Sequence, residues 1–131
     1  MDLLRLWGGH NLKESDNYQS DKWILDLFRN YYDPCPYYSN LDLLHEDWSK
    51  HSFTGVFINP PYSNVTPWIK KAIKTKLDHN RLNVVMLLKH DTSTKWFQLL
   101  HEHGAHFLMI QGRLKFQTNR AAPFPSVLVI L

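Results

Sequence analysis

The sequence has little of what disulfide-bonded and membrane-spanning proteins need. Its single cysteine, Cys35, cannot form a disulfide within the chain, so we expect a reducing compartment. No apolar run approaches the ~18 residues of a membrane span. The first residues also lack the apolar core of a signal peptide. These absences predict a cytoplasmic protein.

The composition predicts one small globular domain. At 131 residues, the chain can form a real core but leaves little room for a second module. Apolar residues make up 44% and charged residues 21%, which is globular usage. The formal charge of +3 permits nucleic-acid binding without demonstrating it. Residues 1–14 have no sustained period, so we expect a flexible arm there and one domain over residues 15–131.

Apolar periodicity alternates between helix and strand along the chain. We expect helices that start near Ser20, Thr66 and Asp91, the last of them ended by Gly104. The expected strands are residues 30–32, 55–58, 83–88 and 106–110, followed by an antiparallel hairpin of residues 112–116 and 126–131. This order predicts a three-layer α/β domain with a mixed sheet.

The strand predicted at residues 55–58 is followed by Asn59-Pro60-Pro61-Tyr62, and open α/β sheets bind their ligands at this end of a strand. These residues offer what methylation of an exocyclic amine needs. The lone pair of such an amine is delocalised into its ring, so hydrogen-bond acceptors are needed to make the nitrogen more tetrahedral as it attacks. The side-chain oxygen of Asn59 and the backbone carbonyl of Pro60 can each accept one N–H, and consecutive prolines hold them in place. The face of Tyr62, and not its hydroxyl, can stack on a flipped-out base. The structural alternative is a strand that ends in an Asn-Pro turn.

Basic residues gather on two segments. The first, Lys70 to Lys76, is typical of a solvated helix face. The second contains Arg113, Lys115 and Arg120 in a turn-like region, where phosphate contact is the alternative to a solvated loop.

The histidines and the cysteine raise two chemical alternatives. The closest histidines are His101, His103 and His106. Since positions 101 and 103 do not share a helix face and no second cysteine or carboxylate completes a ligand spacing, we expect no metal site. No histidine is placed to activate Cys35, and amine methylation needs no covalent enzyme intermediate. We therefore expect Cys35 to have a packing role.

An ordered set of short motifs runs along the chain: Tyr18-Gln19-Ser20, Asp33-Pro34-Cys35, Asp42-Leu43-Leu44, Asn59-Pro60-Pro61-Tyr62-Ser63, Trp96-Phe97, Gly112-Arg113-Leu114-Lys115-Phe116 and Ala122-Pro123-Phe124-Pro125-Ser126. Each motif is weak alone. In this order they resemble the phage-type DNA N-6-adenine methyltransferases, the phage Dam family, over about residues 15–131.

The resemblance implies a Rossmann-like fold that binds S-adenosylmethionine across the carboxyl ends of its strands. The segment Asp33-Pro34-Cys35 resembles the first cofactor motif, which approaches the methionine part. Asp42 resembles the residue that accepts a hydrogen bond from the cofactor adenine, with Leu43 beside the ring. The segment Tyr18-Gln19-Ser20 resembles the one that closes over the methionine end, and Asn59 also faces the cofactor. Asp33 as a turn former and Asp42 as a helix cap are the structural alternatives.

The sequence also departs from the wider methyltransferase pattern. Pro36-Tyr37-Tyr38 stands where a Gly-x-Gly loop would bring backbone close to a nucleotide. Only eight residues separate Asp33 from Asp42, so the fold is shortened after the first strand, and Glu46 or Asp47 could reach the ribose instead. The chain has no insertion long enough for a target-recognition domain.

The activity that the resemblance implies is methylation of adenine N6 in DNA, on a flipped-out base. The alternatives are another conjugated amine (cytosine N4, RNA adenine or protein glutamine) and a DNA-binding remnant without catalysis. The residues expected to contact DNA are Ser63, Lys95, Arg113, Lys115 and Arg120. A homodimer could extend the footprint on DNA, and a phage or prophage enzyme would work in the host cytoplasm.

Overall fold

The computed structural model describes residues 21–35, 43–51, 54–115 and 121–131 of the chain. The arm expected at residues 1–14 lies outside the described residues. Within them, helices and strands alternate along the chain as the sequence predicts.

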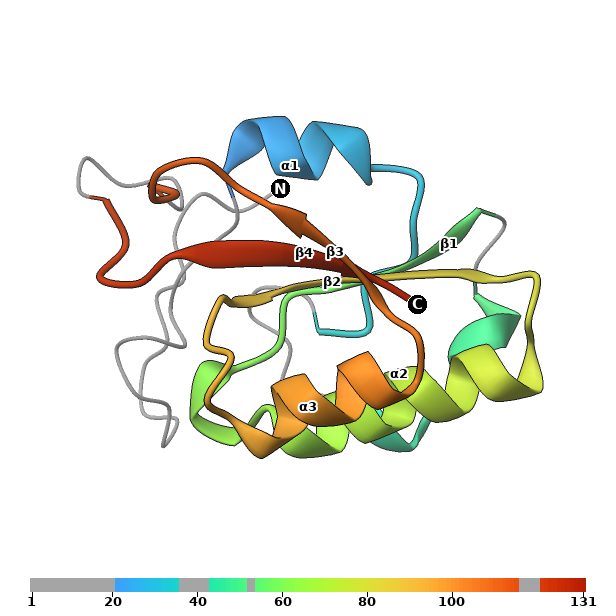
Figure 1. Cartoon of the computed structure of the whole chain (residues 1–131). Coiled ribbons are helices and arrows are strands. Elements are labelled where there is room, and N and C mark those ends of the chain that lie inside the picture. Colours follow the sequence, from blue (N-terminus) through green and yellow to red (C-terminus); the bar gives the residue numbers. More distant parts are fainter. Residues whose placement is uncertain (1–20, 36–42, 52–53, 116–120) are drawn as a thin grey trace.

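A mixed four-stranded sheet forms the middle layer of the molecule (Figure 1). β1 and β2 are parallel, whereas β4 is antiparallel to both β2 and β3. The carboxyl ends of β1, β2 and β3 therefore meet the amino end of β4 at one edge of the sheet, here called the carboxyl edge. The strands, in their spatial order, are β1 (Gly55–Ile58), β2 (Asn83–Lys89), β4 (Ser126–Ile130) and β3 (His106–Met109).

Helices cover both faces of this sheet. The short helix α1 (Lys22–Leu27) lies over one face, whereas α2 (Thr66–Asp78) and α3 (Lys95–Glu102) lie over the other (Figure 1). The predicted three-layer α/β arrangement with a mixed sheet is confirmed. Three short 3-10 helices complete the regular structure of the described residues: η2 (Leu43–His45), η3 (Trp48–Lys50) and η4 (Tyr62–Asn64).

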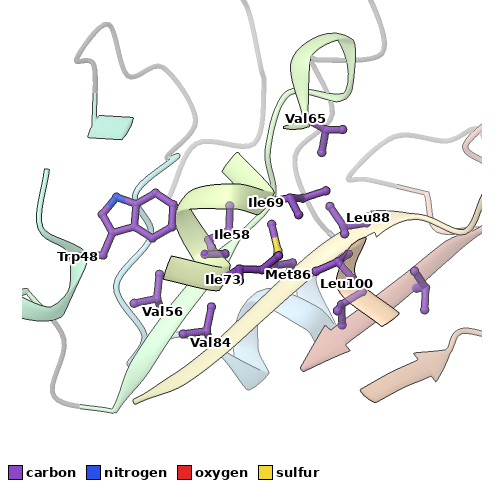
Figure 2. Packing of buried hydrophobic residues seen from close by; sticks show 13 residues of the cluster. Trp48, Val56, Ile58, Val65, Ile69, Ile73, Val84, Met86, Leu88 and Leu100 are labelled. Atoms are coloured by element: carbon purple, nitrogen blue, oxygen red, sulfur yellow. The ribbon is translucent and has the colours of Figure 1, made fainter. Parts of the chain in front are cut away.

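The strands are held by apolar side chains on both faces, as expected for continuous apolar runs. On β1, Val56 and Ile58 point to the α2–α3 face, where they pack with Trp48 and Ile69 (Figure 2). Phe57 points to the opposite face and packs under α1. Because side chains alternate along a strand, the residue after Ile58, Asn59, falls on the α1 side.

The strand expected at residues 30–32 is reduced to a single bridge, in which Tyr32 pairs in parallel with Val56. The amide of Tyr32 donates to the carbonyl of Gly55, and the amide of Phe57 donates to the carbonyl of Tyr32, both at 2.9 Å. Pro34 has no N–H, so it cannot extend the ladder. The segment from Asp33 therefore reaches the carboxyl edge beside β1.

The expected hairpin of residues 112–116 and 126–131 is wrong in its first strand. β4 pairs instead with β3, and Met109 lies opposite Val127. Residues 112–115 are irregular, because Gly112 turns the chain with φ +72° and the amide of Lys115 donates to the Asp21 carboxylate. Residue 116 lies outside the described residues.

The helix starts agree with the predicted positions to within three residues. The first helix has Asp21 at its N-cap, and Ser20 lies outside the described residues. The second begins at Thr66 itself, with Val65 before it. The third is capped by Thr94, whose hydroxyl accepts from the Phe97 amide at 3.2 Å. Its end at Gly104, with φ +74°, agrees with the prediction.

Gly55, the first residue of β1, is a position where the packing excludes any side chain. A Cβ atom there would lie 2.6 Å from the Asn83 carbonyl oxygen and 2.6 Å from the Tyr31 ring. We expect Gly55→Ala to lower the free energy of unfolding by about 1–3 kcal/mol, because the neighbouring strand must shift to admit the methyl group. Urea denaturation measures this. Thr54→Ala, at the exposed preceding position, is the control and should have little effect; equal stability of both variants would contradict the prediction.

Candidate functional site

The tetrapeptide Asn59-Pro60-Pro61-Tyr62 leaves β1 at the carboxyl edge. Asn59 is only 5% exposed and Pro60 is buried, so their polar atoms lie in a largely dry environment. Pro61 has φ −65° and ψ 123°, an extended conformation from which the chain enters η4 at Tyr62. Since the ring of proline fixes φ, this turn presents the Asn59 side chain on a rigid backbone.

The hydroxyl of Tyr62 ties the turn to the sheet. Its oxygen lies 3.1 Å from Oδ1 of Asn59 and 3.2 Å from the carbonyl oxygen of Leu87, and its single hydrogen can be donated to either. The register explains these contacts, because Ile58 pairs with Met86 and the next residues along both strands are Asn59 and Leu87. This hydroxyl contact could not be predicted from the sequence, since Leu87 is distant from Tyr62 along the chain.

Among the described residues, the side chains of Phe124 and Lys89 also contact the Tyr62 ring. The Phe124 ring meets it edge-on, with centroids 5.2 Å apart and planes at 87°. The ammonium of Lys89 lies 5.6 Å from the Tyr62 centroid and 4.7 Å from that of Phe124. Sequence reasoning missed both residues as members of this site. Lys89 is the last residue of β2, which is parallel to β1. Its position at the carboxyl end of a predicted parallel strand is the signal that could have identified it.

The described part of the expected cofactor site lies next to the tetrapeptide. The Tyr32 bridge places Asp33, Pro34 and Cys35 at the carboxyl edge beside β1. Oδ1 of Asp33 accepts from the Cys35 amide at 2.9 Å, so Asp33 is a turn former. Pro34 is buried, and Cys35 is half-buried against the α2–α3 core.

Leu43 and its neighbours follow in η2 and η3. The Leu43 carbonyl accepts from Nε1 of the buried Trp48 at 2.8 Å, which fixes the segment against the core. Of the two residues considered for the ribose, Asp47 caps η3 through Ser49. Four expected residues, Tyr18, Gln19, Ser20 and Asp42, lie outside the described residues.

Glu46, the other residue considered for the ribose, is engaged in a polar cluster. Its Oε1 accepts from the Tyr32 hydroxyl at 3.3 Å and pairs with Nε2 of His51, whose ring stacks on that of Tyr32 with centroids 4.6 Å apart. Burial and, secondarily, the Glu46 carboxylate raise the pKa of Tyr32 to about 12. Tyr32 therefore remains protonated at neutral pH and donates to Glu46.

The residues expected to contact DNA are spread over three loops of the carboxyl edge. Ser63 is exposed in η4. Lys95 opens α3 and lines, with Thr66 and Trp96, a cavity of about 510 Å³ between α2 and α3. Arg113 and Lys115 lie in the connection from β3 to β4, where the Arg113 guanidinium donates to the Ala122 carbonyl at 3.4 Å. Arg120 lies outside the described residues.

The described residues contain neither a metal-binding cluster nor a membrane-spanning helix. No three histidine, cysteine or acidic side chains gather there in a way that could bind a metal ion, and this includes His101, His103 and His106. In the same part of the chain, no helix is both long and apolar enough to cross a membrane.

Comparison with known proteins identifies related sequences. The sequence model of the DNA N-6-adenine-methyltransferase (Dam) family matches residues 13–126. A protein of Haemophilus phage HP1 named DNA N-6-adenine-methyltransferase is 41% identical over 64 residues, which are 48% of this chain and 36% of that protein. A protein of the same name from Escherichia phage T1 is 35% identical over 78 residues, or 60% of this chain and 31% of that protein. The chain thus spans about a third of the length of these relatives. No solved structure matches it.

The hydroxyl contacts of Tyr62 generate a prediction about stability. Tyr62→Phe removes the donor shared by Asn59 and Leu87, so we expect the free energy of unfolding to fall by about 0.5–1.5 kcal/mol. Chemical denaturation measures the loss. Tyr31→Phe is the matched control, because the Tyr31 ring packs against Phe28 and beside Gly55, while its hydroxyl forms no hydrogen bond within the described residues. A loss of the same size in both variants would mean that the hydroxyl of Tyr62 does not stabilise the turn.

Proposed function

Because the chain belongs to the DNA N-6-adenine-methyltransferase (Dam) family, we propose that it transfers a methyl group from S-adenosylmethionine to N6 of a flipped-out adenine in DNA. The observation that carries the proposal is the buried Asn59 beside Pro60 at the carboxyl edge, where open α/β sheets bind ligands. The names of the two phage relatives agree with this substrate.

The chemistry follows from the two acceptors. An adenine amino group is a weak nucleophile until its nitrogen becomes more tetrahedral, and acceptors that take both of its hydrogens favour that geometry. Oδ1 of Asn59 has two lone pairs, so it can accept from the amine while it also accepts from Tyr62. The Pro60 carbonyl takes the second hydrogen. Since Asn59 is buried, the acceptors work in a low dielectric and need no reorganisation.

The described residues fit an S-adenosylmethionine site beside these acceptors. Asp33 presents a carboxylate at the carboxyl edge, and such a group can bind the ammonium of the methionine part. Tyr18, Gln19, Ser20, Asp42 and Leu43 would complete the site, as the family resemblance implies. The bound cofactor would supply a methyl group on a sulfonium. The protein supplies position, because attack requires the nitrogen and the methyl carbon roughly 3–3.5 Å apart and in line.

No strong base is needed in this reaction. The proton can leave after the nitrogen has become cationic, so the acceptor pair is more important than any titrating residue. The ring of Tyr62, held at its hydroxyl end and against Phe124, provides a rigid face for the base.

Other substrates with a conjugated amine are separated by direct assay. Methyl transfer from labelled S-adenosylmethionine is measured on DNA, RNA and protein, and we propose that DNA is the acceptor, in the host cytoplasm if the enzyme is encoded by a phage. A remnant without catalysis would shift DNA in a gel but release no heat with the cofactor in calorimetry. Transfer to RNA or protein alone would overturn the choice of substrate.

Asn59→Ala tests the acceptor role. We expect kcat to fall by about 10²- to 10³-fold, as for the loss of one preorganised transition-state contact, while calorimetry shows cofactor binding retained. Asn64→Ala, at an exposed position of η4, is the control and should leave kcat unchanged. Wild-type turnover in Asn59→Ala would exclude the assignment.

Target specificity should be low if it rests on the loops at the carboxyl edge, because the described residues offer few side chains there to reach base edges. We expect a short or degenerate target around the adenine, with affinity supplied mostly by phosphate contacts of Lys95, Arg113, Lys115 and Arg120 and falling steeply with salt. Sequencing of methylated bases after treatment with the pure protein measures the target, and titration at several salt concentrations measures the slope. Sedimentation establishes whether a homodimer extends the footprint. A long, fully defined target methylated by a monomer with little salt dependence would be the contrary result.

A further inference from the structure

Lys89 places a cation directly at the proposed site, although it is not among the basic residues that the sequence pointed to. It is the last residue of β2 and pairs with Ser126, the first residue of β4. Its ammonium lies 5.6 Å from the centre of the Tyr62 ring and 4.7 Å from that of Phe124. The cation and the two rings therefore come from three chain segments that meet at the carboxyl edge.

Lys89 has cation–π contacts but no fixed anionic partner among the described residues. Within the described residues, no carboxylate forms an ion pair with it. The nearby Asp91 is occupied locally, because its Oδ1 accepts from both the amide and the hydroxyl of Ser93. An ammonium that rests on aromatic faces keeps a weak and exchangeable contact, whereas a phosphate oxygen offers a short, charge-assisted one.

The basic residues that the sequence pointed to are placed differently. The Arg113 guanidinium already donates to the Ala122 carbonyl, and Lys95 lines the cavity between α2 and α3. Among the basic residues that the structure describes, Lys89 is the one whose ammonium lies over the Tyr62 ring.

We infer that Lys89 binds the DNA phosphate next to the target adenine, leaving the Tyr62 ring as the base reaches it. The inference rests on the proposed function, because it identifies which part of the DNA this site holds. Without DNA, the ammonium covers the aromatic face that a base would use. With DNA, the long side chain swings onto the backbone of the same nucleotide, so the exchange couples phosphate binding to uncovering of the ring.

The first test measures the salt dependence of binding to a labelled duplex of mixed sequence. Each phosphate neutralised by a protein cation contributes about 0.9 to the slope of log K against log salt. Lys89→Gln should therefore lose about 0.9 of the slope, whereas Lys89→Arg should keep it. Lys74→Gln is the matched control, since Lys74 is exposed on α2 and paired with Asp78 at 2.6 Å. An unchanged slope in Lys89→Gln, or the same loss in Lys74→Gln, would overturn the inference.

The second test locates the contact. One phosphate beside the target adenine is replaced by a neutral methylphosphonate. The wild type should bind this duplex more weakly than the unmodified one. Lys89→Gln should bind both duplexes with equal affinity, because its phosphate contact is already lost. If the substitution and the methylphosphonate each lower the binding free energy independently, so that their losses add, Lys89 contacts another part of the DNA and the inference is overturned. Thermal melting of both Lys89 variants verifies folding. If the wild type methylates no adenine, the proposed function fails, and the salt slope still decides whether Lys89 binds phosphate.

Discussion

The parallel pairing of β1 with β2 is the interaction on which the whole site depends. It brings the carboxyl ends of two strands to one edge and sets Asn59 beside Leu87, which the Tyr62 hydroxyl then joins. Both strands carry apolar side chains on both faces. If β1 slipped by one residue against β2, the Asn59 side chain would turn from the α1 face to the α2–α3 core. The packing of the core thus determines the position of the proposed acceptor.

The sequence was informative wherever a feature is local. The apolar runs of β1 and β2 and the stop at Gly104 follow from neighbouring residues, and they were predicted correctly. The partner of β4 was predicted incorrectly, because strand pairing across a long connection depends on the sheet and not on the loop between.

The same distinction applies to the site. The tetrapeptide is contiguous, so its residue types alone suggested two acceptors and an aromatic face. Lys89 and Phe124 reach the Tyr62 ring through the β1–β2 and β2–β4 pairings, and no pattern within a short window contains that information. Sequence reasoning also treated the Tyr62 hydroxyl as dispensable, since its partner Leu87 belongs to another strand.

Tyr62 therefore combines two demands that a base-stacking residue alone would not meet. In the proposed function, its ring must be open to a base when DNA is bound, while its hydroxyl holds the turn that carries Asn59. A rigid acceptor and a rigid stacking face separated by one short turn keep the amine and the base plane in a fixed relation, which is what positional catalysis requires. Since the Leu87 contact comes from the sheet, the proposed relation does not depend on the DNA, and on this proposal the binding energy is left for moving the base out of the helix.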